Sequence, residues 1–295
     1  MRGEGPRRRL FRRGVGLASE SAFGQRELFD WALPRLGLDP RSFQRLGKQV
    51  KKRIGRRVSE LGLGNLSEYR DYIEWHAEEW HELDARCFVT ISRFFRDAAA
   101  FQLLERVALP ELAARADAEG LGEIRVWSAG AAAGEEAYSL ALLWRFRVAG
   151  SYPGLALRVL ATELDPVSLG RAARRAYPAG CLREVPDDIR AGAFVRETGQ
   201  LVLRPEHAEG IRFVRGDLRR ELPDGPFDLI ARRNVAFTYF ELAAQRALLA
   251  RLLERLRPGG FLMIGKREDL PEASQALEEV EDGSRLFRHR GLQSR

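Results

Sequence analysis

Apolar and polar positions follow two different rhythms along the chain, and the rhythm changes near residue 120. Before it, apolar residues recur at three- and four-residue steps, as in residues 43–61, which places an apolar stripe on one face of a helix. After it, helical stretches separate five short runs that read as strands: a run that begins at residue 125, and residues 157–162, 211–214, 227–231 and 261–265. Strands separated by helices predict a parallel, doubly wound α/β sheet. The pattern therefore predicts this sheet preceded by a small all-helical domain.

The first of these strands runs into small residues and then into a helix that begins near Glu135. Small side chains at Ala129 and Gly134 let a backbone approach a ligand closely, and a helix start presents free N–H groups. Glu135 and Glu136 at that start would repel a phosphate but attract an ammonium, a sulfonium or a ribose hydroxyl. The turn on its own is also compatible with a simple strand–helix corner.

Polar residues stand where the later strands end, which is the edge of such a sheet that binds ligands. Glu163 and Asp165 follow the second strand, and Asp217 follows the third, with the apolar Leu218 after it. Arg232, Arg233 and Asn234 follow the fourth. A single acid at a strand end is more often a helix N-cap than a ligand. Together with the first turn, Glu163 and Asp217 favour an adenosine-type ligand, with Glu163 as acceptor for the ribose hydroxyls.

Composition excludes several classes of protein. The chain has 295 residues, 45% of them hydrophobic, which is enough for at least one full core. No run approaches 18 apolar residues, so we expect a cytoplasmic protein. Two cysteines and four histidines show no ligand spacing, and we expect no metal. The net charge is +7, but residues 1–14 carry +5 of it. A disordered basic arm over residues 1–23 explains that excess better than nucleic-acid binding.

A second basic feature lies in the helical region. Arg45, Lys48, Lys52 and Arg56 recur at helical spacing on a face different from the apolar stripe. Such a row is usually the solvated face of a surface helix. The alternative is a surface that docks an acidic partner.

Several motifs together resemble the CheR family, the S-adenosylmethionine-dependent protein-glutamate methyltransferases that act on chemotaxis receptors. They include Phe94-Phe95-Arg96-Asp97, Trp127-Ser128-Ala129 with Gly134-Glu135-Glu136, Ala161-Thr162-Glu163-Leu164-Asp165, Arg233-Asn234, Tyr239-Phe240 and Arg257-Pro258-Gly259-Gly260. The last motif is generic to class I methyltransferases, whereas Phe-Phe-Arg-Asp with Gly-Glu-Glu is specific. The resemblance implies a helical domain over residues 24–100 and a Rossmann-like methyltransferase domain over residues 101–295.

The resemblance also implies the site. Arg96 would lie near the methionyl end of S-adenosylmethionine, Glu135 or Glu136 would meet its α-amino group, and Tyr239 would lie close to the methyl acceptor. The implied catalytic residues are Arg96 and Tyr239. The implied cofactor site, which also holds the product S-adenosylhomocysteine, is Thr90, Ser92, Arg96, Ala129, Gly134, Glu135, Glu136, Glu163, Asp165, Asp217, Leu218, Arg232, Arg233 and Asn234. The basic row Arg45, Lys48, Lys52 and Arg56 would engage an acidic receptor bundle.

The chain departs from the family pattern in ways that bear on function. Thr90 and Ser92 stand where Asn and Thr are usual, Glu163 replaces Asp, and Arg232 replaces Cys. The family's inserted β subdomain has room here for little more than one hairpin, around residues 194–203. A protein-glutamate methyltransferase is the leading prediction. A methyltransferase for nucleic acid or a small molecule, and a non-catalytic cofactor-sensing module, are the alternatives.

Overall fold

The computed structural model describes residues 23–87, 92–233, 239–271 and 275–291, apart from the side chains of residues 44–48. The basic arm expected over residues 1–23 therefore lies almost entirely outside the described residues. So do Thr90 and Asn234, and the side chains of Arg45 and Lys48. No helix in the described ranges is long and apolar enough to cross a membrane.

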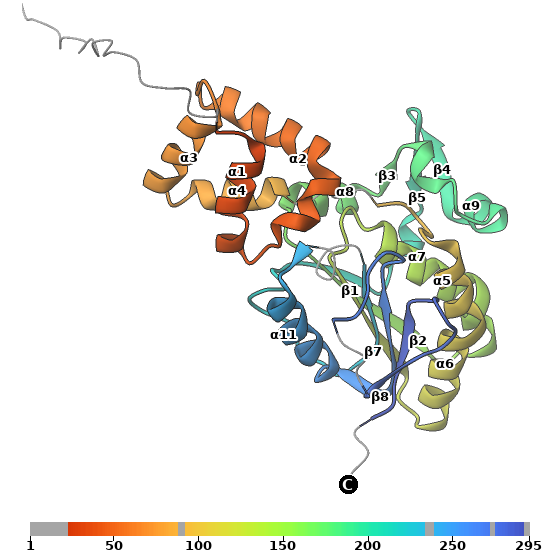
Figure 1. The fold of residues 1–295 in the computed structure, drawn as a ribbon. Helices are drawn as coiled ribbons and strands as arrows, with labels where there is room; N and C mark the ends of the chain where they lie inside the picture. The colour runs from red at the N-terminus through yellow and green to blue at the C-terminus, as the bar shows by residue number, and fades with distance from the viewer. Residues whose placement is uncertain (1–22, 88–91, 234–238, 272–274, 292–295) are drawn as a thin grey trace, which may run out of the picture.

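The first part of the chain folds into a cluster of helices beside the sheet (Figure 1). Asp39 caps the helix that begins at Pro40, the longest of them, because its side chain accepts from the N–H of Arg41. Asn65 caps the helix that begins at Leu66. A 3₁₀ turn, Pro34–Leu36, follows the first helix. In residues 23–87 the α-helices are α1 (Gln25–Ala32), α2 (Pro40–Glu60), α3 (Leu66–Trp75) and α4 (Glu79–Cys87).

A seven-stranded sheet forms the centre of the second part, in the order β6-β2-β1-β7-β8-β10-β9. Strands β6, β2, β1, β7 and β8 are parallel, and β10 runs antiparallel to both β8 and β9. The bounds are β1 (Glu123–Ala129), β2 (Ala156–Glu163), β6 (Ile211–Arg215), β7 (Phe227–Arg232), β8 (Leu256–Ile264), β9 (Leu277–Glu279) and β10 (Leu286–His289). The predicted doubly wound α/β sheet behind a helical region is confirmed.

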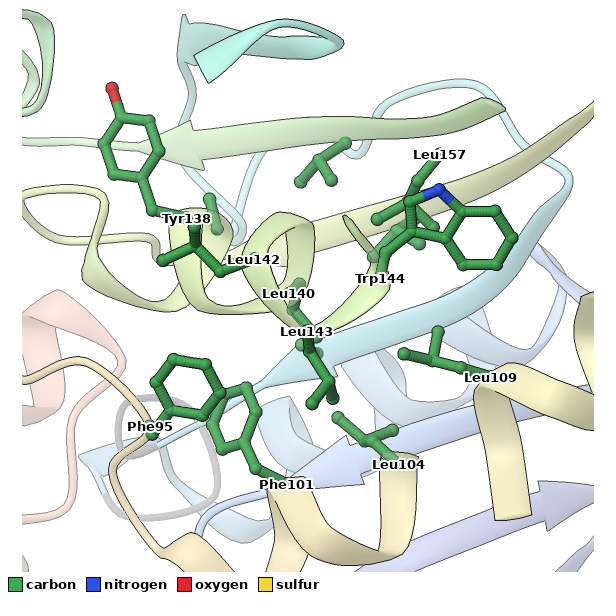
Figure 2. Close-up of a cluster of buried hydrophobic side chains, with 14 of the residues drawn as sticks. Phe95, Phe101, Leu104, Leu109, Tyr138, Leu140, Leu142, Leu143, Trp144 and Leu157 are labelled. Atoms are coloured by element: carbon green, nitrogen blue, oxygen red, sulfur yellow. The ribbon is translucent and has the colours of Figure 1, made fainter. Parts of the chain in front are cut away.

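Helices cover the sheet and bury two hydrophobic clusters. The connecting helices are α5 (Ala98–Leu103), α6 (Leu109–Ala118), α7 (Glu135–Leu143), α8 (Pro166–Arg174) and α11 (Leu242–Leu253), with π-helical turns at Leu104–Ala108 and Trp144–Val148. One cluster packs α5, α6 and α7 on the sheet; Figure 2 shows Phe95 and Phe101 beside one another within it, with ring centroids 5.1 Å apart. The other cluster joins the sheet to α11 and to helices α1–α4.

The part of the chain that connects α8 to β6 forms a small lobe that projects from the sheet (Figure 1). It contains α9 (Asp187–Ala193) and an antiparallel sheet in the order β3-β5-β4. The strands are β3 (Ala176–Tyr177), β4 (Phe194–Glu197) and β5 (Gln200–Leu203). The expected hairpin is present as β4 and β5, but the expectation of little more than a hairpin was too small, because β3 pairs with β5.

The helical cluster is joined to the sheet by direct contacts near the carboxyl ends of the strands. Leu38 forms an isolated antiparallel bridge with Phe240, and the N–H of Asp39 donates to the carbonyl of Tyr239 at 2.8 Å. The rings of Phe43 and Tyr239 lie 5.3 Å apart. These contacts bring α2 to the edge of the sheet at which the predicted site residues stand.

Candidate functional site

The turn between β1 and α7 has a backbone conformation and close contacts that require small residues. Gly134 has φ +89°, and a Cβ there would lie 2.8 Å from the Tyr138 ring and 3.0 Å from the Phe213 ring. Ala132 also has a positive φ, of +51°. The N–H groups of Gly130 and Ala131 donate to the carbonyl of Thr162 on β2. The turn is thereby fixed against the end of the second strand.

Two buried glutamates begin α7, with exposed fractions of 2% for Glu135 and 8% for Glu136. Glu136 accepts a hydrogen bond from Ser128 Oγ at 2.7 Å and lies 3.6 Å from the guanidinium of Arg233. Glu135 interacts with Ser92, but its Oε2 atom is buried and has no hydrogen-bond partner among the described residues. Burial raises the pKa of both carboxyls. Of the two, Glu135 has the open acceptor.

Glu163 closes the same turn from the end of β2. Its Oε2 accepts from the N–H of Ala132 at 2.8 Å, and its Oε1 accepts from the N–H groups of Leu164 and Asp165 at 2.8 and 3.0 Å. Burial raises the pKa of this carboxyl, and the three N–H donors only partly offset that effect. A carboxylate has about four lone-pair sites, so about one remains, on Oε2.

Asp165 has a different task in the structure. Its Oδ1 accepts from the N–H of Val167, and its Oδ2 accepts from the N–H and the hydroxyl of Ser168. These contacts make Asp165 the N-cap of α8. The cap accounts for its place after β2, and its predicted contact with a cofactor gains no support from this geometry.

Asp217 follows β6, with Leu218 buried beside it. Arg219 donates to the Asp217 carboxylate from its backbone N–H and from its guanidinium. Burial alone would raise the pKa of Asp217, but the bonds from Arg219 outweigh burial, and the pKa lies below its usual value. Asp217 is therefore a held, ionised acceptor at the strand-end edge.

The two arginines that follow one another at the end of β7 differ completely in their surroundings. Arg233 forms an ion pair with Asp97, approaches Glu136 and lies 5.7 Å from the centre of the Phe101 ring. Arg232 is fully buried, and none of its guanidinium nitrogens has a hydrogen-bond partner among the described residues. Burial lowers the pKa of Arg232 to about 10, although nearby Glu268, Glu136 and Glu163 favour its charged form.

Arg96 and Tyr239, the two predicted catalytic residues, are both among the residues that the structure describes. Arg96 lies between two residues with positive φ, Phe95 and Asp97, and the Phe95 N–H donates to Ser139 Oγ at 2.9 Å. Burial raises the pKa of Tyr239 to about 12, and Arg96 is close enough to affect it electrostatically. The predicted residues that the structure describes thus gather at one edge of the sheet, where β1, β2, β6 and β7 end.

Some residues at this edge were not predicted. Glu268 follows β8, is 1% exposed and accepts from the N–H of Gly265 at 2.8 Å. It could have been found by the rule that found Glu163, because it too is an acid just beyond a strand. Ser128 and Asp97 stand inside the motifs that carry the resemblance, but their partners, Glu136 and Arg233, are distant in sequence. No group of three His, Cys, Asp or Glu side chains suited to a metal occurs in the described parts of the chain.

Comparison with known proteins agrees with this geometry. A family model described as "CheR methyltransferase, SAM binding domain" matches residues 90–285. The chemotaxis protein methyltransferase of Listeria monocytogenes is 31% identical over 235 residues, which cover 80% of this chain and 86% of that protein. The protein of the same name from Escherichia coli K12 is 30% identical over 277 residues, covering 86% of this chain and 93% of that protein.

Another relative is much longer than this chain. An uncharacterized 104.1 kDa protein of Rhodobacter capsulatus is 32% identical over 246 residues, which cover 82% of this chain but only 24% of that protein. The family match covers most of the sheet and the strand-end residues described above. The chain therefore belongs to the CheR family and is an S-adenosylmethionine-dependent methyltransferase.

Proposed function

We propose that this enzyme, acting in the cytoplasm, transfers the methyl group of S-adenosylmethionine to glutamate carboxylates of an acidic, chemoreceptor-like protein, and that S-adenosylhomocysteine is the other product. The observation that carries the proposal is the buried Oε2 of Glu135, an acceptor without a partner among the described residues at the start of α7. The α-ammonium of the cofactor would supply its missing donor. Relatives that are named chemotaxis protein methyltransferases support the choice of acceptor.

The strand ends offer acceptors in the order that an extended cofactor requires. Glu135 would bind the α-ammonium group, and the remaining lone-pair site of Glu163 Oε2 would accept from a ribose hydroxyl. Asp217 and Leu218, at the end of the adjacent edge strand β6, would flank the adenine. Because β1, β2 and β6 are neighbours in the sheet, the three groups follow one another across its edge.

The chemistry needs positioning more than proton transfer. A carboxylate oxygen of the acceptor forms a bond to the methyl carbon while the sulfur–carbon bond breaks and its electron pair stays on sulfur. A cation and an anion thus become a neutral thioether and a neutral ester, so a site with little water favours the step. The acceptor is already ionised at neutral pH and needs no general base. The guanidinium of Arg96 would orient the carboxylate of the cofactor or of the acceptor, and Tyr239 would lie beside the acceptor.

The basic face of α2 would receive the protein substrate. Lys52 and Arg56 are exposed on this helix, and Arg45 and Lys48 belong to the same helical row. Arg53 is close enough to Tyr239 to affect its pKa, so α2 reaches from the surface to the edge of the sheet. Arg57 is excluded from this role because Glu79 holds its guanidinium, with bonds of 2.9 and 2.6 Å.

The decisive experiment incubates the enzyme with S-adenosylmethionine labelled in its methyl group and with a lysate that contains protein and nucleic acid. We expect label on protein that is released as methanol by mild base, because methyl esters of glutamate hydrolyse there. Base-stable label on RNA or DNA would show a nucleic-acid methyltransferase. Binding of S-adenosylhomocysteine without any transfer would show a non-catalytic sensing module.

A variant tests the proposed role of Arg96. Arg96→Ala should retain its melting temperature and lose about 100-fold in turnover, the cost of losing a positioning contact. Arg96→Lys should rescue turnover only in part, because an ammonium does not bind a carboxylate bidentately. Arg106→Ala, which removes an exposed arginine paired with Glu281, is the matched control. A large fall in the melting temperature of Arg96→Ala would show that Arg96 only anchors the segment between the helical domain and the sheet.

A further inference from the structure

Arg219 connects the two parts of the molecule at the strand-end edge. It lies in the connection between β6 and β7, and its guanidinium is shared by two carboxylates. Nε and Nη2 face Asp217 at 3.0 and 2.9 Å, and Nη1 and Nη2 face Asp84 at 2.8 and 2.5 Å. Asp217 is two residues away in sequence, whereas Asp84 belongs to α4 of the helical cluster. The guanidinium is therefore fixed by two forked ion pairs, one on each edge.

The hydrogen bonds from Arg219 leave one acceptor position on the Asp217 carboxylate. Its Oδ1 receives both the backbone N–H and Nε of Arg219, and its Oδ2 receives Nη2. Three of about four lone-pair sites are thus filled by Arg219, and the remaining one lies on Oδ2, to which Arg220 Nε makes a long ion-pair contact of 3.8 Å without a hydrogen bond. A hydrogen-bond donor at the edge of the sheet, such as an exocyclic amino group, would fill it.

Asp84 decides how the guanidinium is oriented. Asp84 is 7% exposed, and Arg219 is its only ion-pair partner among the described residues. Because Asp84 holds Nη1 and Nη2 bidentately and the guanidinium is planar, Nε and Nη2 have little freedom to rotate away from Asp217. Without Asp84, Arg219 would lose its bidentate partner on the helical cluster and keep the bonds to its neighbour Asp217 and a long 3.5 Å contact to the Leu36 carbonyl. The donors released from Asp84 would then compete for the open site on Asp217.

We propose that Asp84 and Arg219 are positioning residues: the helical domain, through Arg219, holds Asp217 so that its Oδ2 accepts the 6-amino group of the cofactor's adenine. This inference rests on the proposed placement of the adenine beside Asp217. It gives the helical domain a part in cofactor binding in addition to its proposed part in substrate docking. Coupling of this kind is reciprocal, so a substrate that shifts α4 changes the affinity for the cofactor, and the cofactor changes the affinity for the substrate by the same factor.

The test measures the binding of two ligands by calorimetry. One is S-adenosylhomocysteine, and the other is its purine analogue, which lacks the 6-amino group. Asp84→Asn should weaken binding of S-adenosylhomocysteine about tenfold, the equivalent of one hydrogen bond to a charged acceptor. It should change binding of the purine analogue less than about twofold, since that ligand has no amino group for Asp217. Arg219→Lys should show the same difference, because a lysine lacks the fork.

Controls separate this effect from loss of folding. Asp71→Asn removes an exposed acid from α3 of the same helical cluster and should leave both affinities unchanged. Equal weakening of both ligands by Asp84→Asn would overturn the inference in favour of general destabilisation, and so would no weakening of either. If the wild-type enzyme failed to bind S-adenosylhomocysteine at all, the proposed cofactor site itself would be wrong. If the wild-type enzyme bound S-adenosylhomocysteine but Asp84→Asn did not weaken that binding, the proposed cofactor site would stand and this inference would fall.

Discussion

Glu163→Ala is the substitution for which the structure gives the sharpest quantitative expectation. The Glu163 carboxylate holds the turn after β1 through the N–H of Ala132 and holds its own strand end through the N–H groups of Leu164 and Asp165. In the proposed complex, it also accepts from the ribose. Alanine removes all of these contacts at once, so the variant should lose both stability and affinity.

The loss of stability should come mainly from Ala132. Its N–H belongs to a buried residue that is 8% exposed, whereas Leu164 and Asp165 are partly exposed, so water can hydrate their N–H groups more readily. One orphaned buried N–H costs about 1–3 kcal/mol. In a domain of this size, that corresponds to a fall of roughly 2–10 °C in melting temperature. The lost ribose bond, to a charged acceptor, corresponds to roughly 10- to 100-fold weaker binding of S-adenosylhomocysteine.

Calorimetry with S-adenosylhomocysteine and a thermal melt without ligand measure the two effects separately. Asp165→Ala is the matched control, because it removes the N-cap of α8 and should cost about 1 kcal/mol of stability. Its affinity for S-adenosylhomocysteine should stay within about twofold of wild type, since both Asp165 oxygens are engaged by the helix. An unchanged affinity in Glu163→Ala would refute the ribose assignment, whatever the change in melting temperature.

Three further predictions concern the same edge of the sheet. Burial raises the pKa of Glu135 in the folded protein above its value of 4.5 in the unfolded chain. The protonated carboxyl therefore stabilises the fold fully below pH 4.5, and this stability should be lost as the pH rises through the raised pKa of the folded protein. Affinity for S-adenosylhomocysteine should rise over that window, because an ammonium requires the ionised carboxylate; Glu135→Gln should abolish this pH dependence in calorimetric titrations, and its persistence would assign the ammonium to another acid. Arg232→Met should raise the free energy of unfolding by about 1 kcal/mol or more in urea titrations, because it removes a buried cation without acceptors in the described structure, whereas Arg233→Met should lower it by about 3 kcal/mol through loss of the Asp97 and Glu136 contacts. The reverse order of the two variants would contradict this account. Gly134→Ala should cost about 2 kcal/mol or more, since it forces a Cβ into the Tyr138 ring at positive φ, while Gly150→Ala, where a Cβ meets nothing within 4 Å, should be almost neutral in the same titration.

The fold was predictable because its signals are local. Apolar runs and the helical stretches between them depend on neighbouring residues, and a parallel doubly wound sheet is the arrangement that buries such runs on both faces. The same rule placed Glu163, Asp217 and Arg233 at one edge, because every parallel strand ends there. The extent of the small lobe was underestimated because β3 contains only two residues and is defined by its pairing with β5.

The partners of the site residues were not predictable, because they depend on contacts between residues distant in sequence. The sequence by itself determined the class of sheet, the edge that bears the site and the acids at the strand ends. Tertiary structure alone decided that Asp165 caps a helix, that Glu136 is engaged by Ser128 and Arg233 while Glu135 keeps an open acceptor, and that Asp84 reaches Arg219 across 135 positions. The physical reason is that a residue type fixes which bonds a side chain can make, whereas burial and the few donors within about 3 Å fix which of those bonds it makes.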